Sequence, residues 1–358
     1  MIEVIAALIR WLALASNMIL IGGCVFLAIA GRERVAFDNP WFARLKRTLP
    51  WLAITLLLGL LGLLAVTTAQ VTGNVESAWH PGTWLELLQK TRIGLIWTWR
   101  TALALLLLAA ALYARLSSRT SWQYVLCAIV AALTLAVGSL ASHSAAEDLS
   151  VLSVLPYMLH IVLASVWAGG LPAFLTLLFA DTGNQPDRKA DRFGIQTLKR
   201  FSAMALPVML AVIVTGVVVT YRMVDTSYAA LAATSYGWFL NSKLALLLVI
   251  LIIAARAHFV WVPLLGRNDN VADAGERGLR RWVTVEVVLA SALVLAATFL
   301  ANAVPAKHAV IEDWPSIPFL HRRYLGRCHC HGPCGDRNHS LVTGRRCSRV
   351  RSIQALGG

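Results

Sequence analysis

Residues 151–179 read VLSVLPYMLHIVLASVWAGGLPAFLTLLF, a stretch that contains no Asp, Glu, Lys or Arg. A helix of roughly 20 apolar residues is long enough to cross the hydrocarbon core of a bilayer. This stretch exceeds that length, so it can cross the membrane with some tilt. It therefore predicts a transmembrane helix.

Other stretches of the same kind recur along the chain, which is 58% hydrophobic and 14% charged. A soluble domain has no need of so many long apolar runs. We expect an all-α, polytopic membrane helix bundle of about eight transmembrane helices. The predicted spans are residues 4–30, 49–71, 96–115, 122–141, 151–179, 202–222, 240–263 and 283–304.

Basic residues concentrate in the loops after the first, third, fifth and seventh predicted spans. Cytoplasmic loops of membrane proteins carry an excess of Lys and Arg, so we expect these loops in the cytoplasm and both termini outside. The net charge of +14 then reflects membrane topology, with lipid as the surroundings and no nucleic-acid partner. The loop residues are Arg32, Arg34, Arg44, Lys46, Arg47, Arg115, Arg119, Arg188, Lys189, Arg192, Lys199, Arg200, Arg267, Arg277, Arg280 and Arg281.

Two halves of the chain, residues 1–141 and 142–304, can be aligned. Ala15-Ser16 precedes Gly22-Gly23 in the first span, and Ala164-Ser165 precedes Gly169-Gly170 in the fifth. Because each half has four spans, the halves run in the same direction, as in a parallel repeat. Chance similarity between apolar, Gly- and Ala-rich helices explains the match equally well.

His160 lies within an apolar span, and His143 lies at the outer end of the span before it. An ionisable residue is costly inside a membrane and is by default a candidate functional residue. Imidazole and thioether ligands together favour copper, and thioether favours Cu(I). The alternative is a structural role, in which His160 hydrogen-bonds a Ser or a backbone carbonyl and holds two helices together. Further candidate ligands near the outer side are His80, Met158, Met223 and His308, although Met158 and His160 lie on different helix faces.

Other membrane residues have expected structural roles. Gly169 and Gly170 let helices approach closely, and Trp167 packs beside them. Arg256 and Glu286 fall at similar depths on consecutive spans, near the cytoplasmic side. We expect them to face each other as an intramembrane ion pair, since neither should stand alone there.

With these residues the chain resembles the CopD family of bacterial copper-resistance membrane proteins, over about residues 1–318. The resemblance implies a protein of the bacterial inner membrane, and with it termini that are periplasmic. It also implies that the protein moves copper inward, as uptake, beside a periplasmic CopC-type copper-binding partner, with His143 and His160 as copper ligands. The matching segments are Ser142-His143-Ser144-Ala145-Ala146, Leu159-His160, residues 166–171, Arg200-Phe201-Ser202, Thr215-Gly216, residues 234–237, Lys243-Leu244, Pro263, Arg281 with Glu286, and Thr91, Gly94 and Arg100.

The composition of residues 305–358 differs from that of the membrane region before them. They are Arg-rich, and they include Cys328-His329-Cys330-His331 and Cys334. A disordered extension from a shifted reading frame is one explanation. A metal-binding tail is the other, because closely spaced Cys and His can hold zinc or copper.

Three functions fit the pattern. The first is copper uptake across the inner membrane through intramembrane His and Met ligands, by a protein that is not an enzyme. The second is a haem-binding, cytochrome b-like oxidoreductase, which needs axial ligands paired on facing helices. The third is a copper sensor or assembly protein that binds copper without moving it.

Overall fold

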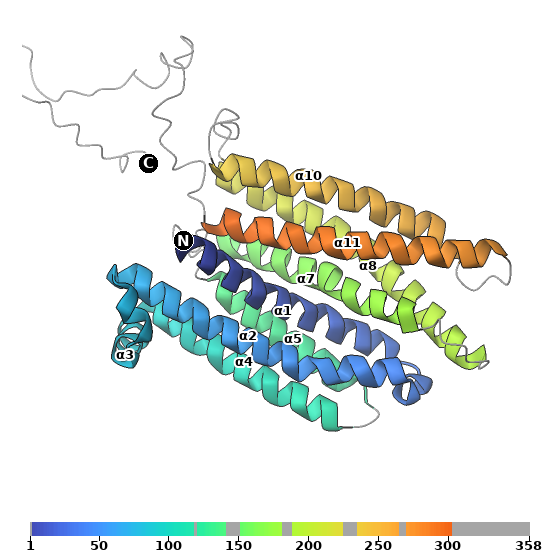
Figure 1. The fold of residues 1–358 in the computed structure, drawn as a ribbon, viewed down its shortest axis with the longest axis horizontal. Helices are drawn as coiled ribbons and strands as arrows, with labels where there is room; N and C mark the ends of the chain where they lie inside the picture. Colours follow the sequence, from blue (N-terminus) through green and yellow to red (C-terminus); the bar gives the residue numbers. More distant parts are fainter. Residues whose placement is uncertain are drawn as a thin grey trace, which may run out of the picture. The chain divides into compact units, whose positions relative to one another are not determined.

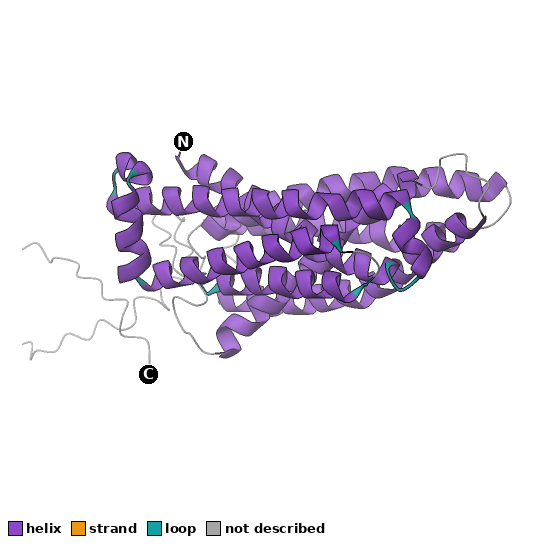
Figure 2. Ribbon diagram, turned by 90° about the horizontal axis from the view of Figure 1, so that it is seen from below, coloured by secondary structure: helices purple, strands orange, loops and turns teal. Residues whose placement is uncertain are grey.

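The computed structural model describes residues 2–117, 120–140, 151–180, 188–224, 235–264 and 270–302. Every regular element in these ranges is helical (Figure 2). Eight of the helices are long and apolar enough to cross a membrane, which confirms the predicted all-α polytopic bundle. By contacts the chain divides into two units, Met1–Ile311 and Glu312–Gly358, and all of the described residues belong to the first unit.

Helix α1 (Ile2–Ala30) lies at the centre of the bundle (Figure 1). Its most extensive contact is with α7 (Val151–Ala180), and it also packs against α2 (Pro40–Thr72), α5 (Trp122–Ser139) and α11 (Asn270–Asn302). The first span of one half therefore packs on the first span of the other half.

The remaining contacts follow a two-fold pattern. In the first half α1 packs on α2 and α4 (Arg92–Leu116) on α5; in the second half α7 packs on α8 (Arg188–Val224) and α10 (Ser235–Arg256) on α11. Two parallel four-helix repeats would produce this arrangement. One contact departs from it: α2 packs closely on α4, whereas α8 and α10 have no comparable contact among the described residues.

Close approach of α1 and α7 depends on glycine. A Cβ atom on Gly22 would collide with the backbone of Gly169 and Gly170, and one on Gly169 would collide with the Met18 carbonyl. A Cβ on Gly170 would collide with the ring of Phe201. Small residues at such crossings allow dispersion contacts to form in lipid, where apolar burial provides no driving force.

Several helix ends follow local chemistry. Asn39 caps α2, its side chain accepting a hydrogen bond from Trp41 N at 2.9 Å, and Pro40 occupies the first helical turn. Gly73 follows α2 with a φ of 69°, a left-handed conformation that glycine adopts without strain. The helix that contains the second span thus begins at residue 40, not 49, because it also includes the basic residues that precede the apolar stretch.

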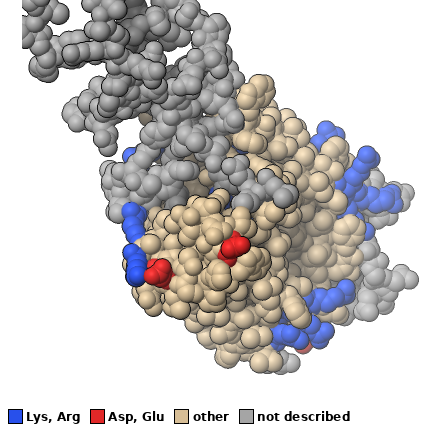
Figure 3. Space-filling model, turned by 60° about the vertical axis from the view of Figure 1, so that its left-hand side comes forward, with Lys and Arg blue, Asp and Glu red and all other residues tan. Residues whose placement is uncertain are grey.

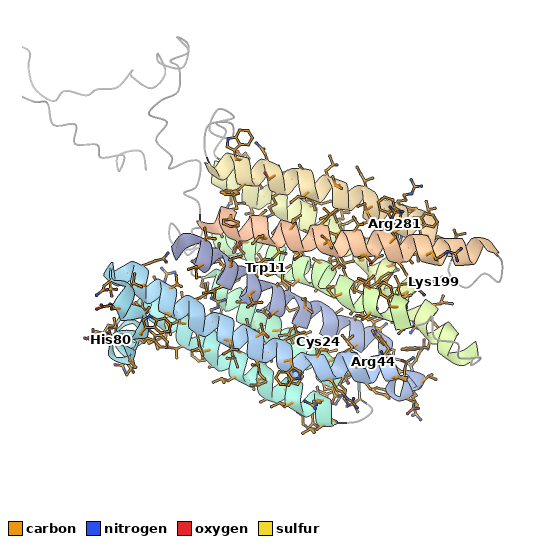
Figure 4. All side chains as sticks on the ribbon, viewed as in Figure 1. Trp11, Cys24, Arg44, His80, Lys199 and Arg281 are labelled. Atoms are coloured by element: carbon orange, nitrogen blue, oxygen red, sulfur yellow. The ribbon has the colours of Figure 1, made fainter. Side chains whose placement is uncertain are left out.

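The two ends of the bundle differ. One end carries a short 3-10 helix, η2 (Val75–Trp79), and helix α3 (Pro81–Lys90). Figure 4 places His80 at this end and Arg44, Lys199 and Arg281 toward the opposite end. Between the ends, much of the face in Figure 3 carries neither Lys, Arg, Asp nor Glu. Large apolar side chains are exposed, as expected for lipid-facing positions, and examples are Leu58, Leu210 and Ile252.

Candidate metal centre

His160 lies on the middle part of α7 and faces α8. Its Nδ1 atom is 3.0 Å from the Val212 carbonyl oxygen and 3.2 Å from Thr215 Oγ1. Its ring lies against Gly216, where an added Cβ would be 3.0 Å from His160 Cε1. The absent side chain at Gly216 is therefore what makes room for the imidazole.

The backbone partner fixes the tautomer of His160. A carbonyl oxygen only accepts hydrogen bonds, so Nδ1 carries the proton and donates it. Thr215 Oγ1 donates its own hydrogen to the Ala211 carbonyl at 2.7 Å, which leaves its lone pairs toward the histidine. The Nε2 lone pair has no hydrogen-bond partner among the described residues. A ring oriented by an Nδ1–H···O=C bond, with Nε2 available, is a usual arrangement of metal-binding histidines.

The same hydrogen bond also fits a purely structural role, since His160 on α7 bonds a backbone carbonyl of α8 and so joins the two helices. A purely structural role accounts for Nδ1 alone. It leaves Nε2, a second polar ring atom in an apolar span, without a hydrogen-bond partner among the residues that the structure describes, and an unpaired polar atom is costly there.

The structure brings none of the other predicted ligands to His160 within the described ranges. His80 is exposed at the start of α3, at the end of the bundle. Met158 is half-buried on α7, two residues from His160. Met223 belongs to the last turn of α8, but its side chain lies outside the described residues, as do His143 and His308 entirely. No group of three His, Cys, Asp or Glu side chains suited to a metal occurs in the part of the chain described.

A second polar cluster lies further along α7 and α8. Trp167, which is 4% exposed, lines a cavity of about 60 Å³ between α7, α8, α11, and the end of α10 with the turns that follow it. Glu286 and His258 line the same cavity. Ser202 Oγ is 2.8 Å from His258 Nδ1, so α8 is joined here to the π-helical turn η3 (Ala257–Trp261).

The expected ion pair between Arg256 and Glu286 is wrong. Arg256 is exposed at the end of α10, whereas Glu286 is 3% exposed, and no ion pair joins them in the described structure. Sequence position gives the depths of the two residues, but it does not give their directions around the helix axes. Arg256 points away from the bundle, where a long side chain can reach the headgroups. His258, two residues later, takes the inward position and lines the same cavity as Glu286.

The comparisons with known proteins match the two halves of the membrane region separately. Residues 1–151 match the family described as "Copper resistance protein D-like, N-terminal domain", and residues 195–300 match "Copper resistance protein D". No solved structure matches the chain.

Two curated relatives align with a little under two thirds of this chain. "Copper transport protein CutJ" of Bacillus subtilis (strain 168) is 29% identical over 230 residues, covering 64% of this chain and 41% of the relative. "Inner membrane protein YebZ" of Escherichia coli (strain K12) is 26% identical over 226 residues, covering 62% of this chain and 72% of the relative. The aligned region thus spans less than half of the first relative. With eight apolar spans and matches to both family domains, this chain is a multi-pass membrane protein that belongs to the copper resistance protein D family.

Proposed function

We propose that this protein carries copper across the bacterial inner membrane, from periplasm to cytoplasm, as a transporter and not as an enzyme. The observation that carries the proposal is the geometry of His160. Its Nδ1 is held by the Val212 carbonyl at 3.0 Å, and its Nε2 is left available as a ligand inside an apolar span. The copper resistance family and the name of the first relative support copper as the transported ion.

Inward transport rests on the family resemblance, and the proposed topology identifies the two sides of the membrane. Arg44, Lys199 and Arg281 lie toward one end of the bundle, which the positive-inside rule assigns to the cytoplasm (Figure 4). The opposite end, with α3 and His80, would then face the periplasm and hold both termini. His143, Met223 and His308 would capture copper there, and a CopC-type protein would deliver it.

Inward flux of copper into proteoliposomes tests the proposal. The full chain is reconstituted with a copper-responsive dye in the lumen, and Cu(I) is added outside with a weak chelator. We expect flux with the wild type, its loss with His160→Ala, and its retention with the control Met204→Leu, a change on α8 away from His160. Equal flux for wild type and His160→Ala would contradict the role of His160.

The alternatives give different results in companion measurements. A Soret band in the visible spectrum of the purified protein would point to a haem-binding oxidoreductase. Copper binding that depends on His160 without any flux would point to a sensor or assembly protein.

A further inference from the structure

The inner cavity beside Trp167 has the side chains of a second binding site. Most of its lining is apolar, contributed by residues such as Leu171, Phe174 and Val283. A volume of about 60 Å³ exceeds the roughly 10–15 Å³ that a single water molecule needs, so the cavity has room for an ion. Its four other notable groups are the Met209 thioether, the Ser202 hydroxyl, the His258 imidazole and the Glu286 carboxyl.

The buried carboxyl group of Glu286 indicates that the cavity binds a ligand. Its side chain belongs to a residue only 3% exposed, and it lines the cavity. Within the described residues it has neither a hydrogen bond nor an ion pair, because Arg256 is exposed elsewhere. A buried carboxylate without a partner is costly, so a positive charge in the cavity would stabilise it.

His258 and Met209 supply the ligand types that select the ion. When His258 Nδ1 donates to Ser202 Oγ at 2.8 Å, Nε2 is left to bind a metal, as at His160. Met209 brings a thioether to the same cavity. Imidazole and thioether ligands favour copper over magnesium or calcium, and the thioether favours Cu(I). Cu(I) and a carboxylate also cancel each other's charge, which lowers the cost of holding the ion inside the membrane.

One face of α8 joins this cavity to His160. Ser202, Ala205 and Met209 line the cavity, and Val212 and Thr215 contact His160. Spacings of three and four residues place all five positions on one face of the helix. Met209 is three residues from Val212, which is about 4.5 Å along the helix axis.

We propose that this cavity is a second Cu(I) site, formed by Met209, His258 and Glu286 and reached from His160 along α8. The inference rests on the proposed function, because it makes the cavity the next copper-binding site after His160 on the same transport pathway. It also gives a role to His258 and Glu286, which the outer site does not use.

Cu(I) binding by the full purified chain tests the proposal. All proteins carry Ser in place of Cys328, Cys330, Cys334 and Cys347, so that tail thiols do not contribute. Each is titrated with Cu(I) against a chromogenic chelator. Glu286→Gln and Met209→Leu are each expected to remove one equivalent or to weaken it at least tenfold. The matched control is Met204→Leu, because Met204 also lies on α8 but packs against the core and does not line the cavity.

X-ray absorption at the copper edge gives an independent readout. Met209→Leu should remove a sulfur neighbour from the bound copper, and Met204→Leu should not. Glu286→Gln keeps the size of the side chain and places no new charge in the cavity, so the variant should fold as well as the wild type. Unfolding therefore would not explain a loss of binding.

The outcomes separate the two proposals. If His160→Ala loses one equivalent and the cavity variants bind as the wild type does, the inner site is overturned and the outer one stands. If the cavity variants lose copper and His160→Ala does not, the inner site stands and the role proposed for His160 fails. Wild-type protein that binds no Cu(I) would overturn both.

Discussion

Gly22→Ala should destabilise the protein, whereas Gly23→Ala, one residue further along α1, should not. A Cβ on Gly22 would collide with the backbone of Gly169 and Gly170 and would lie 2.7 Å from the Gly169 carbonyl oxygen, where ordinary contact begins at 3.4 Å. Backbone atoms cannot rotate away as a side chain can, so α1 and α7 must separate. A Cβ on Gly23 meets nothing within 4 Å.

The magnitude follows from the shift that the new methyl group demands. A gap of about 0.5–1 Å already removes roughly a quarter to a half of the dispersion energy of each contact. This loss falls on the most extensive helix contact of the described structure. Overpacking of this kind typically costs about 1–3 kcal/mol. Replacing Gly by Ala in a helix interior returns about 0.5–1 kcal/mol, and this gain is common to both variants.

Thermal unfolding in detergent measures the difference. At roughly 2–4 °C per kcal/mol, Gly22→Ala should unfold several degrees below Gly23→Ala. Because membrane proteins often unfold irreversibly, the two variants must be heated at the same rate. An apparent Tm for Gly22→Ala equal to or above that of Gly23→Ala would refute the assignment of this crossing as close backbone packing.

Two further predictions concern the cap of α4 and the buried thiols. Thr91→Ala should lower stability by about 1 kcal/mol in thermal unfolding, because the Thr91 hydroxyl accepts a hydrogen bond from the first turn of α4 at 2.9 Å. Cys24 and Cys127 are buried free thiols, so with the four tail cysteines replaced by Ser an aqueous maleimide should label neither until denaturant is added.

The span pattern was predictable because hydrocarbon thickness dictates helix length. All eight predicted spans correspond to helices of the structure. The largest errors lie at helix ends on the basic side, where α2 begins at residue 40, α8 at residue 188 and α11 at residue 270. Hydropathy marks where a helix enters the lipid, whereas capping residues such as Asn39 decide where the helix itself begins.

The candidate site was predictable only in part. The cost of an ionisable side chain in lipid identified His160, but no periodic pattern indicates that Val212 and Thr215 lie opposite it. Glu286 was expected to need a partner, and depth alone suggested Arg256. Rotation about the helix axis decides which of Arg256 and His258 faces inward, and the π-helical turn after Arg256 alters the regular periodicity there.

The copper content of the purified full chain, measured by elemental analysis after equilibration with Cu(I), tests the role of His160 most directly. Three proteins are compared: wild type, His160→Ala, and the variant with Ser at the four tail cysteines. We expect copper to fall by one equivalent with His160→Ala, and the site to remain when the tail cysteines are replaced. A copper content that falls when the tail cysteines are replaced, and does not change with His160→Ala, would contradict this role. His160 would then be a packing residue hydrogen-bonded to α8.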